Sequence, residues 1–347
     1  MPQSIVRPRA VLHSADRMPV RIAAIEVSHW HSLWDSAYLR HLEAMPDVEL
    51  VGLHDPSPEI AAHRAAALGN PPTFTDYVAM LEKTRPNFVL ALGRHSVMPE
   101  VAHHLLDHGY PFVMEKPMGI DAGQVQGVAD KATATRGFAA VPLNYRYNPF
   151  VVHARRLLVE GRFGPVSHFY SRLNRPTSAR YPAWGAPWML DPAVAGGGCL
   201  RNLSPHALDV FLHLTGEEAT VTGAQLSWRA REQRVEDYAS VLLRSASGIL
   251  ATIEVGNTFP RDGTDGEWKL AGRDAILVQK DGVLRLSTAT GDETLPSEVA
   301  EPLPLIALRD ILDRWRRGEP PPVSVHDCLR VVRLIDRAYE LAGRPYG

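Results

Sequence analysis

Cysteine is scarce in this sequence, and its scarcity excludes two kinds of cross-linked fold. The 347 residues include only two cysteines, Cys199 and Cys328. They lie far apart and match no metal-ligand spacing, so we expect neither a disulfide framework nor a zinc ribbon. We interpret both as buried free thiols of a protein in the reducing cytoplasm, and we predict no metal site.

An excess of basic charge and a long apolar run are also absent. Lys plus Arg number 37 against 39 Asp plus Glu, whereas a nucleic-acid-binding domain carries a basic excess. No apolar stretch approaches the roughly 20 residues that span a bilayer. Residues 1–18 have no apolar segment typical of a secretory signal, so we expect a short N-terminal extension. The sequence therefore predicts no nucleic-acid partner and no membrane partner.

The first half of the remaining sequence alternates apolar runs with helical patterns. The apolar runs are 20–27, 48–53, 87–92, 112–114 and 138–143. Strands that alternate with helices predict βαβ units and a parallel sheet, and continuous apolar strands predict a sheet covered on both faces. We therefore predict a Rossmann-type, doubly wound α/β domain over residues 19–144. Ligands of such sheets bind beyond the carboxyl ends of the strands.

The second half has a different pattern, in which strand-like runs follow one another through short Gly, Asp and Ser turns. These runs are 166–173, 219–228, 238–243, 248–255, 268–270 and 275–279. Such a series predicts an open, mainly antiparallel sheet in an α+β domain over residues 145–347. Two helices are expected with it. One starts near Asn202, with Ser204 as N-cap and Pro205 as first helical residue, and the other covers about 325–342.

Two motifs carry residue types that can do chemistry. Glu115-Lys116-Pro117 follows a predicted strand, where proline keeps Lys116 extended and the ammonium could bind a substrate hydroxyl. An isolated tripeptide of this kind is more often a surface turn. The second motif is Gly196-Gly197-Gly198, whose backbone can pass close to a ligand or to another strand.

A histidine follows the glycine triplet on the predicted helix. His206 is expected in the first helical turn, where the helix N-terminus favours the neutral imidazole that can act as a base. Asp209 lies one turn later on the same face, and Asn202 precedes the histidine by four residues. On its own, this pattern is more often a histidine satisfied by local hydrogen bonds beside a glycine-rich surface loop.

Taken in order, these motifs resemble a known family. The Glu-Lys-Pro turn, Arg146-Tyr-Asn-Pro149, the glycine triplet, His206-x-x-Asp209 and Val235–Tyr238 followed by Gly248 resemble the glucose–fructose oxidoreductase / inositol dehydrogenase / MocA (Gfo/Idh/MocA) family. The resemblance covers the chain from about Val20 onward. It implies a protein that transfers hydride between a nicotinamide cofactor and a secondary alcohol or ketone of a sugar, cyclitol or related polyol. It also implies a homodimer or homotetramer formed through the C-terminal sheet.

The resemblance assigns expected roles to individual residues. Lys116 matches the catalytic lysine, and His206 matches the histidine that takes the hydroxyl proton, while Asn202 stands where the family has an aspartate. Arg146, Trp188, Asn202, His206 and Asp209 are expected at the substrate, and Arg180, Tyr181 and Trp184 lie in the same predicted loop. The residues expected at the cofactor are Ser28, His29, His31, Asp55, Gly93, Arg94, His95, Glu115 and Lys116.

One segment departs from the family pattern. After the first strand, where a dinucleotide-binding domain carries G-x-G-x-x-G, this chain has Glu26-Val-Ser-His-Trp-His31 without a glycine. Asp55 ends the second strand, where an acid can bind the ribose of NAD and repel the extra phosphate of NADP, or can serve only as a turn residue. NAD is the expected cofactor.

The departure motivates two other hypotheses. A non-redox lyase or hydrolase could use the histidines near the strand ends, with His29-x-His31 as the seed of a metal site. A sensor or partner subunit without a cofactor would explain why the glycines are missing.

Overall fold

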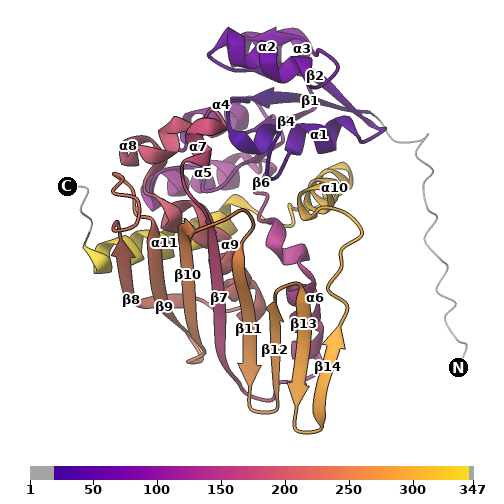
Figure 1. The fold of residues 1–347 in the computed structure, drawn as a ribbon. Helices are drawn as coiled ribbons and strands as arrows, with labels where there is room; N and C mark the ends of the chain where they lie inside the picture. The colour runs from indigo at the N-terminus through magenta and orange to yellow at the C-terminus, as the bar shows by residue number, and fades with distance from the viewer. Residues whose placement is uncertain (1–18, 344–347) are drawn as a thin grey trace, which may run out of the picture.

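The computed structural model describes residues 19–343, and the predicted N-terminal extension, 1–18, lies outside them. A parallel sheet in the order β3-β2-β1-β4-β5-β6 forms the N-terminal domain (Figure 1). Its elements are β1 (Val20–Ile25), η2 (Trp30–Ser32), α1 (Tyr38–Glu43), β2 (Val48–His54), α2 (Pro58–Ala66), β3 (Thr73–Phe74), α3 (Tyr77–Thr84), β4 (Phe88–Ala91), α4 (Met98–Asp107), β5 (Phe112–Met114), α5 (Ala122–Thr135) and β6 (Ala139–Ala140). The strand order reverses between β1 and β4, which confirms the predicted doubly wound fold and places a ligand crevice at that point.

An eight-stranded sheet dominates the rest of the chain, in the order β14-β13-β12-β11-β7-β10-β9-β8. All neighbouring strands are antiparallel except β7 and β10, which pair in parallel, so the prediction of an open, mainly antiparallel sheet is confirmed. The elements are η3 (Asn144–Tyr147), α6 (Pro149–Val159), β7 (Val166–Pro176), α7 (Arg180–Ala183), η4 (Pro187–Leu190), α8 (Pro192–Ala195), α9 (Cys199–Thr215), β8 (Ala219–Ser227), β9 (Tyr238–Ser245), β10 (Leu250–Phe259), β11 (Asp265–Gly272), β12 (Ala275–Lys280), β13 (Val283–Thr288), β14 (Gly291–Leu295), α10 (Leu303–Arg316) and α11 (Val325–Ala342).

The two C-terminal helices join the domains. Leu308 and Ile311 of α10 pack into the N-terminal core that contains Ile22 of β1. Helix α11 contributes one group of apolar side chains, including Val332, to the N-terminal core and another, including Ile335, to the core under the large sheet. Because the first half of α11 packs mainly in the N-terminal core and its second half in the core under the large sheet, this helix fixes one domain against the other.

Helix α9 begins earlier than the sequence predicts. The helix starts at Cys199, so Ser204 and Pro205 lie inside it and the predicted N-cap is wrong. The carboxylate of Glu236 performs the capping, because it accepts hydrogen bonds from the backbone N–H groups of Gly198 and Leu200 at 2.9 Å. An acceptor more than thirty residues away along the chain replaces the local hydroxyl that the sequence pattern favours. Asn202 therefore lies in the first turn and His206 in the second.

Candidate functional site

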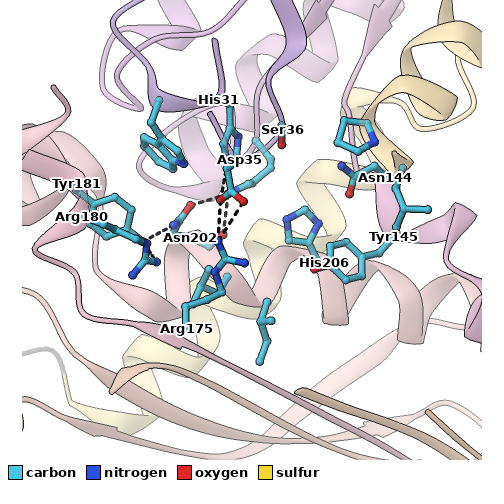
Figure 2. Close-up of a pocket in the computed structure, with 16 residues that line it drawn as sticks. His31, Asp35, Ser36, Asn144, Tyr145, Arg175, Arg180, Tyr181, Asn202 and His206 are labelled. Carbon is cyan, nitrogen blue, oxygen red and sulfur yellow. Dashed lines mark hydrogen bonds and ion pairs between the residues drawn. The ribbon is translucent and has the colours of Figure 1, made fainter. Parts of the chain in front are cut away.

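A pocket lies between the two domains at the carboxyl edge of the parallel sheet (Figure 2). It has two sides that we name here. The helix wall consists of Asn202, Leu203 and His206 of α9, and the loop wall consists of Trp30, His31, Asp35 and Ser36, which follow β1. The remaining lining residues are Lys116, Asn144, Tyr145, Leu173, Arg175, Arg180, Tyr181, Leu303 and Pro304.

Lys116 forms the floor of this pocket, directly after β5. Its side chain is 2% exposed, and Nζ donates hydrogen bonds to the backbone carbonyl of Asn202 at 2.7 Å and to its Oδ1 at 2.6 Å. Asn202 Nδ2 in turn donates to the hydroxyl of Tyr181 at 2.7 Å. Burial lowers the pKa of Lys116, while Glu115, 4.0 Å away, favours its charged form. The pocket floor is therefore an oriented ammonium held by an amide.

His206 lies across the pocket from the loop wall, beside Tyr145, with ring centroids 4.6 Å apart (Figure 2). Burial and the nearby Lys116 lower the pKa of His206 to about 3. The predicted cause, the N-terminus of the helix, does not apply because His206 is in the second turn. Its Nδ1 atom has no hydrogen-bond partner among the described residues, so a neutral imidazole with an open nitrogen faces the pocket region.

The glycine triplet lets the backbone approach other protein segments. A Cβ on Gly196 would lie 2.7 Å from the carbonyl oxygen of Ile120, and one on Gly198 would lie 2.4 Å from that of Glu236. On Gly197, whose φ is +147°, it would lie 1.9 Å from the hydroxyl of Tyr339. Of the two possibilities that the sequence leaves open, the structure shows close approach to protein, and this approach positions α9 against the pocket floor.

Three residues expected at the substrate do not line this pocket. Arg146 Nη2 binds Asp209 Oδ1 at 2.6 Å and Asp327 Oδ1 at 3.0 Å, so this arginine ties η3 to α9 and α11. Asp209 is 2% exposed and engaged in that ion pair. Trp188 packs in an aromatic cluster behind the loop wall. Arg180 and Tyr181, in contrast, do line the pocket.

The segment after β1 keeps the turn of a dinucleotide-binding loop but uses different residues. Glu26 adopts a left-handed φ of 53°, a conformation that glycine usually supplies. Its carboxylate binds Arg94 Nη2 at 2.8 Å, next to Gly93. The backbone N–H of Ser28 donates to Asp55 Oδ2 at 2.7 Å. No α-helix begins here, because the 3-10 helix η2 and a turn precede α1 at Tyr38.

Aromatic and imidazole rings fill the space behind the loop wall. His29 stacks on Trp30 with ring centroids 4.0 Å apart, and Trp188 packs within 5.1 Å of His95. Burial lowers the pKa of His29, and it lowers that of His95 to about 3. The Nε2 atoms of both histidines and Nε1 of Trp188 are buried without a hydrogen-bond partner among the described residues.

Asp35 is a pocket residue that the sequence does not single out. Its carboxylate binds Arg175 Nη2 at 3.1 Å and lies 3.7 Å from His31 Nε2, on the side of the pocket facing His206 (Figure 2). The other ring nitrogen of His31, Nδ1, lies 3.3 Å from Glu115 Oε1. The i,i+4 spacing of His31 and Asp35 could have suggested that the two side chains are neighbours on a helix. However, the two residues do not lie on one continuous helix, because η2 ends at Ser32 and α1 begins at Tyr38.

A nicotinamide dinucleotide, the cofactor that the resemblance implies, fits this edge unevenly. The nitrogens of His29, His95 and Trp188 lack hydrogen-bond partners among the described residues, but they are buried behind the loop wall and do not line the pocket. At the turn, the N–H of Ser28 is already used by Asp55, and no helix N-terminus is available for a phosphate. Lys116, Asn202 and His206, which line the pocket, fit the reacting end of the cofactor, and Arg94, 39% exposed, is the cation that the turn presents toward a diphosphate.

Among residues 19–343, no helix is long and apolar enough to cross a membrane. The same part of the chain contains no group of three or more His, Cys, Asp or Glu side chains placed to hold a metal ion.

Comparison with known proteins finds relatives that are dehydrogenases of a sugar or a cyclitol. Levoglucosan dehydrogenase of Pseudarthrobacter phenanthrenivorans is 24% identical over 241 residues, which are 60% of this chain and 62% of that protein. Inositol 2-dehydrogenase of Rhizobium meliloti is 26% identical over 189 residues, 53% of this chain and 54% of that enzyme. The matched segments therefore span between half and two thirds of these two relatives.

Solved structures match over a larger share of the chain. An oxidoreductase from Agrobacterium radiobacter in complex with NAD+, L-tartaric acid and magnesium superposes with a TM-score of 0.82 at 15% identity, covering 94% of this chain and 96% of the other. Levoglucosan dehydrogenase in complex with NADH and levoglucosan gives 0.81 at 19% identity, with 94% and 97% covered. At these identities the likeness establishes the fold.

Two family profiles match in succession. Residues 33–141 match the oxidoreductase family with an NAD-binding Rossmann fold, and residues 151–278 match the Gfo/Idh/MocA C-terminal domain. The first match begins after β1 and the glycine-free turn, the segment whose geometry departs from a dinucleotide cradle. Since both domains match in the right order and the folds superpose nearly end to end, the chain belongs to the Gfo/Idh/MocA oxidoreductase family, with an NAD-binding Rossmann domain at its N-terminus.

Proposed function

We propose that this protein is an NAD-dependent oxidoreductase that interconverts a secondary alcohol and a ketone on a sugar, a cyclitol or a related polyol. The observation that carries this proposal is the buried ammonium of Lys116, held by Asn202 on the floor of a pocket that His206 also lines. The family membership and the dehydrogenase relatives support the same reaction type.

The pocket residues have distinct tasks in this reaction. Bound nicotinamide supplies or accepts the hydride. Lys116 donates a hydrogen bond to the reacting oxygen and stabilises the negative charge that develops on it. Asn202 holds the ammonium in place through its Oδ1 and carbonyl oxygen. His206, neutral at physiological pH, presents an open ring nitrogen to a substrate hydroxyl.

The other predicted site residues take supporting roles in the proposal. At the cofactor we assign Ser28, His29, His31, Asp55, Gly93, Arg94, His95 and Glu115. Asp55 favours NAD over NADP because its carboxylate sits at the end of β2, where a 2′-phosphate would be repelled. Arg146 and Asp209 act on the substrate only indirectly, by holding α9, and Trp188 acts by packing behind the loop wall.

Calorimetric titration of protein stripped of dinucleotide tests this proposal. We expect binding of NAD and NADH in the micromolar range and weaker binding of NADP, followed by turnover with polyols in a substrate panel. No binding at millimolar dinucleotide would overturn the proposal. It would favour the second candidate, a cofactor-free sensor or non-redox enzyme, which the occupied N–H of Ser28 and the absent helix N-terminus support.

We also propose that the protein assembles as a homodimer or homotetramer through the large sheet. One face of this sheet packs on α9, while Leu242, Leu250, Ile276 and Val283 are 40–47% exposed. Light scattering of the wild type and of Leu242→Asp tests the assembly, and a monomeric wild type would contradict it.

For the compartment, we propose the cytoplasm. Both thiols, Cys199 and Cys328, are buried and free, as suits a reducing environment. Cell fractionation is the corresponding test.

A further inference from the structure

His31 is held between two carboxylates that differ in exposure. Its Nδ1 lies 3.3 Å from Glu115 Oε1, and its Nε2 lies 3.7 Å from Asp35 Oδ2. The side chain of Glu115 is 1% exposed and that of Asp35 is 36% exposed. The imidazole therefore lies between a carboxylate of the interior, Glu115, and one that lines the pocket, Asp35. Figure 2 shows His31 and Asp35 beside each other.

The same series of groups continues to the pocket floor. Glu115 Oε1 lies 4.0 Å from the ammonium of Lys116. Lys116, Glu115, His31 and Asp35 thus form a line of titratable groups, spaced at ion-pair distances of 3.3 to 4.0 Å, that runs from the floor of the pocket to its rim. His31 Nδ1 and the Glu115 oxygens have no hydrogen-bond partner among the described residues. No other described histidine near the pocket has a carboxylate at each ring nitrogen.

The charges around His31 favour its protonated form. A neutral imidazole would leave Glu115 and Asp35 as two anions on opposite sides of one buried ring, and a proton on His31 relieves that repulsion. The other polar neighbours are His29 and Tyr38, which pack against the ring, Lys116 beside Glu115, and Arg175, which binds Asp35 from β7. Burial lowers the pKa of His31, but Glu115 and Asp35 outweigh burial and raise it above 6.5.

The helix wall lacks an equivalent arrangement. Asn202 stands four residues before His206 and cannot carry the charge that would support an imidazolium. His206 has a pKa of about 3 and no hydrogen-bond partner at Nδ1 among the described residues. His206 can accept a hydrogen bond, but its imidazole does not hold a proton near neutral pH because its pKa is low.

We propose that the proton of the reaction is exchanged through Lys116, Glu115, His31 and Asp35, with His31 as its store, and that His206 only orients the substrate. This assignment rests on the proposed function. In the reductive direction the carbonyl carbon gains the hydride of the reduced nicotinamide, and the oxygen gains a proton as an N–H bond of Lys116 breaks. Lys116 recovers that proton from His31 through Glu115, and His31 is recharged from solvent through Asp35. Oxidation runs the same transfers backwards.

The first test is a titration of the histidine NMR signals in protein free of dinucleotide. His31→Gln identifies the His31 signal, which we expect to titrate above pH 6.5. Asp35→Asn should lower that pKa because one anion is lost. Arg175→Met, the matched control, should raise it because a cation is lost from the same ion pair. A His31 that titrates below 6.5, or that ignores both substitutions, overturns the proposal.

The second test is the pH dependence of turnover. We expect His31→Gln to lower kcat for ketone reduction at least about tenfold and to remove the pH limb of His31, with partial rescue by added imidazole. His206→Gln should keep that limb and mainly raise KM. A preserved limb in His31→Gln overturns the relay alone, while a wild type without dinucleotide-dependent turnover overturns the proposed function as well. If His31→Gln does not fold, Asp35→Asn at the rim provides the same comparison.

Discussion

The two walls of the pocket are built in different ways. The helix wall is attached to the protein by the close backbone contacts of the glycine triplet and by the hydrogen bonds of the Glu236 cap at the start of α9. On the side of the loop wall, Glu26, Ser28 and His31 stand where a dinucleotide fingerprint has glycines, and the polar groups there are paired with Arg94, Asp55 and Glu115 across the end of the sheet. The two walls are therefore held by different means, one by backbone contacts of α9 and the other by paired side-chain charges.

The largest effect is expected from Lys116, the floor shared by both walls. Replacing it by Met removes the only ammonium that contacts Asn202, and we expect kcat/KM to fall by about 10³-fold or more. Lys131→Met, on the surface of α5 where the ammonium binds Asp107, is the control and should leave turnover unchanged. Retention of more than a tenth of the activity by Lys116→Met would show that the pocket floor is not where the reaction occurs.

A glycine exchange probes the helix wall through stability. Gly197→Ala would place a methyl group 1.9 Å from the hydroxyl of Tyr339 at a φ of +147°, and we expect a loss of about 3 kcal/mol in the free energy of unfolding. Gly216→Ala also has a positive φ, +68°, but meets no atom within 4 Å, so it should cost only about 1 kcal/mol. Equal losses in urea unfolding would mean that α9 is not held by this contact.

The helix wall was also the part that the sequence predicted well. Lys116, Asn202 and His206 were singled out from a strand end and a glycine triplet, and the structure brings them together. Both sheets were predicted because their hydrophobic periods are local properties of the chain. The cap of α9 was predicted wrongly because Glu236 reaches it from a distant segment. The residues around the start of α9 do not indicate that a distant carboxylate accepts these hydrogen bonds.

The loop wall was less predictable for the same reason. Asp35 matters because Arg175 and His31 converge on it, and neither contact follows from a motif. Asp55 was expected to face a ribose or to end a turn, and its carboxylate accepts hydrogen bonds from the N–H of Ser57, two residues on, and from the N–H of the distant Ser28. Helix α10 and strands β13 and β14 were not predicted from the sequence.

The two pocket histidines should respond to pH with opposite sign. His206 has a folded pKa of about 3 against about 6.5 unfolded, so its contribution to stability is present above pH 6.5 and is lost as the pH falls. His31 has a raised folded pKa, so its contribution is present below 6.5 and is lost as the pH rises through the folded value. Urea midpoints across this range should fall less steeply on the acid side in His206→Gln, where His29 and His95 still contribute, and less steeply on the alkaline side in His31→Gln. If the urea midpoints of the two variants changed with pH in the same direction, the opposite roles of His206 and His31 would be refuted.

The smallest effect concerns the turn after β1. Glu26 places a buried negative charge beside Arg94, the cation that the turn presents to solvent. Glu26→Gly removes the anion and also suits the left-handed φ of 53°, so the backbone should hold its shape. A freed guanidinium can bind a phosphate oxygen, and we expect NADH to bind roughly three- to tenfold more tightly, or about 1 kcal/mol.

Glu26→Gln separates the two causes of that gain. It removes the charge but keeps a side chain at the strained position, so it should show most of the tighter binding if charge is the reason. The gain should also shrink as salt is added, because the guanidinium is partly exposed. If neither variant changes the affinity measured by calorimetry, the diphosphate does not approach Arg94. The loop wall would then serve the proton path through His31 and take no part in holding the cofactor.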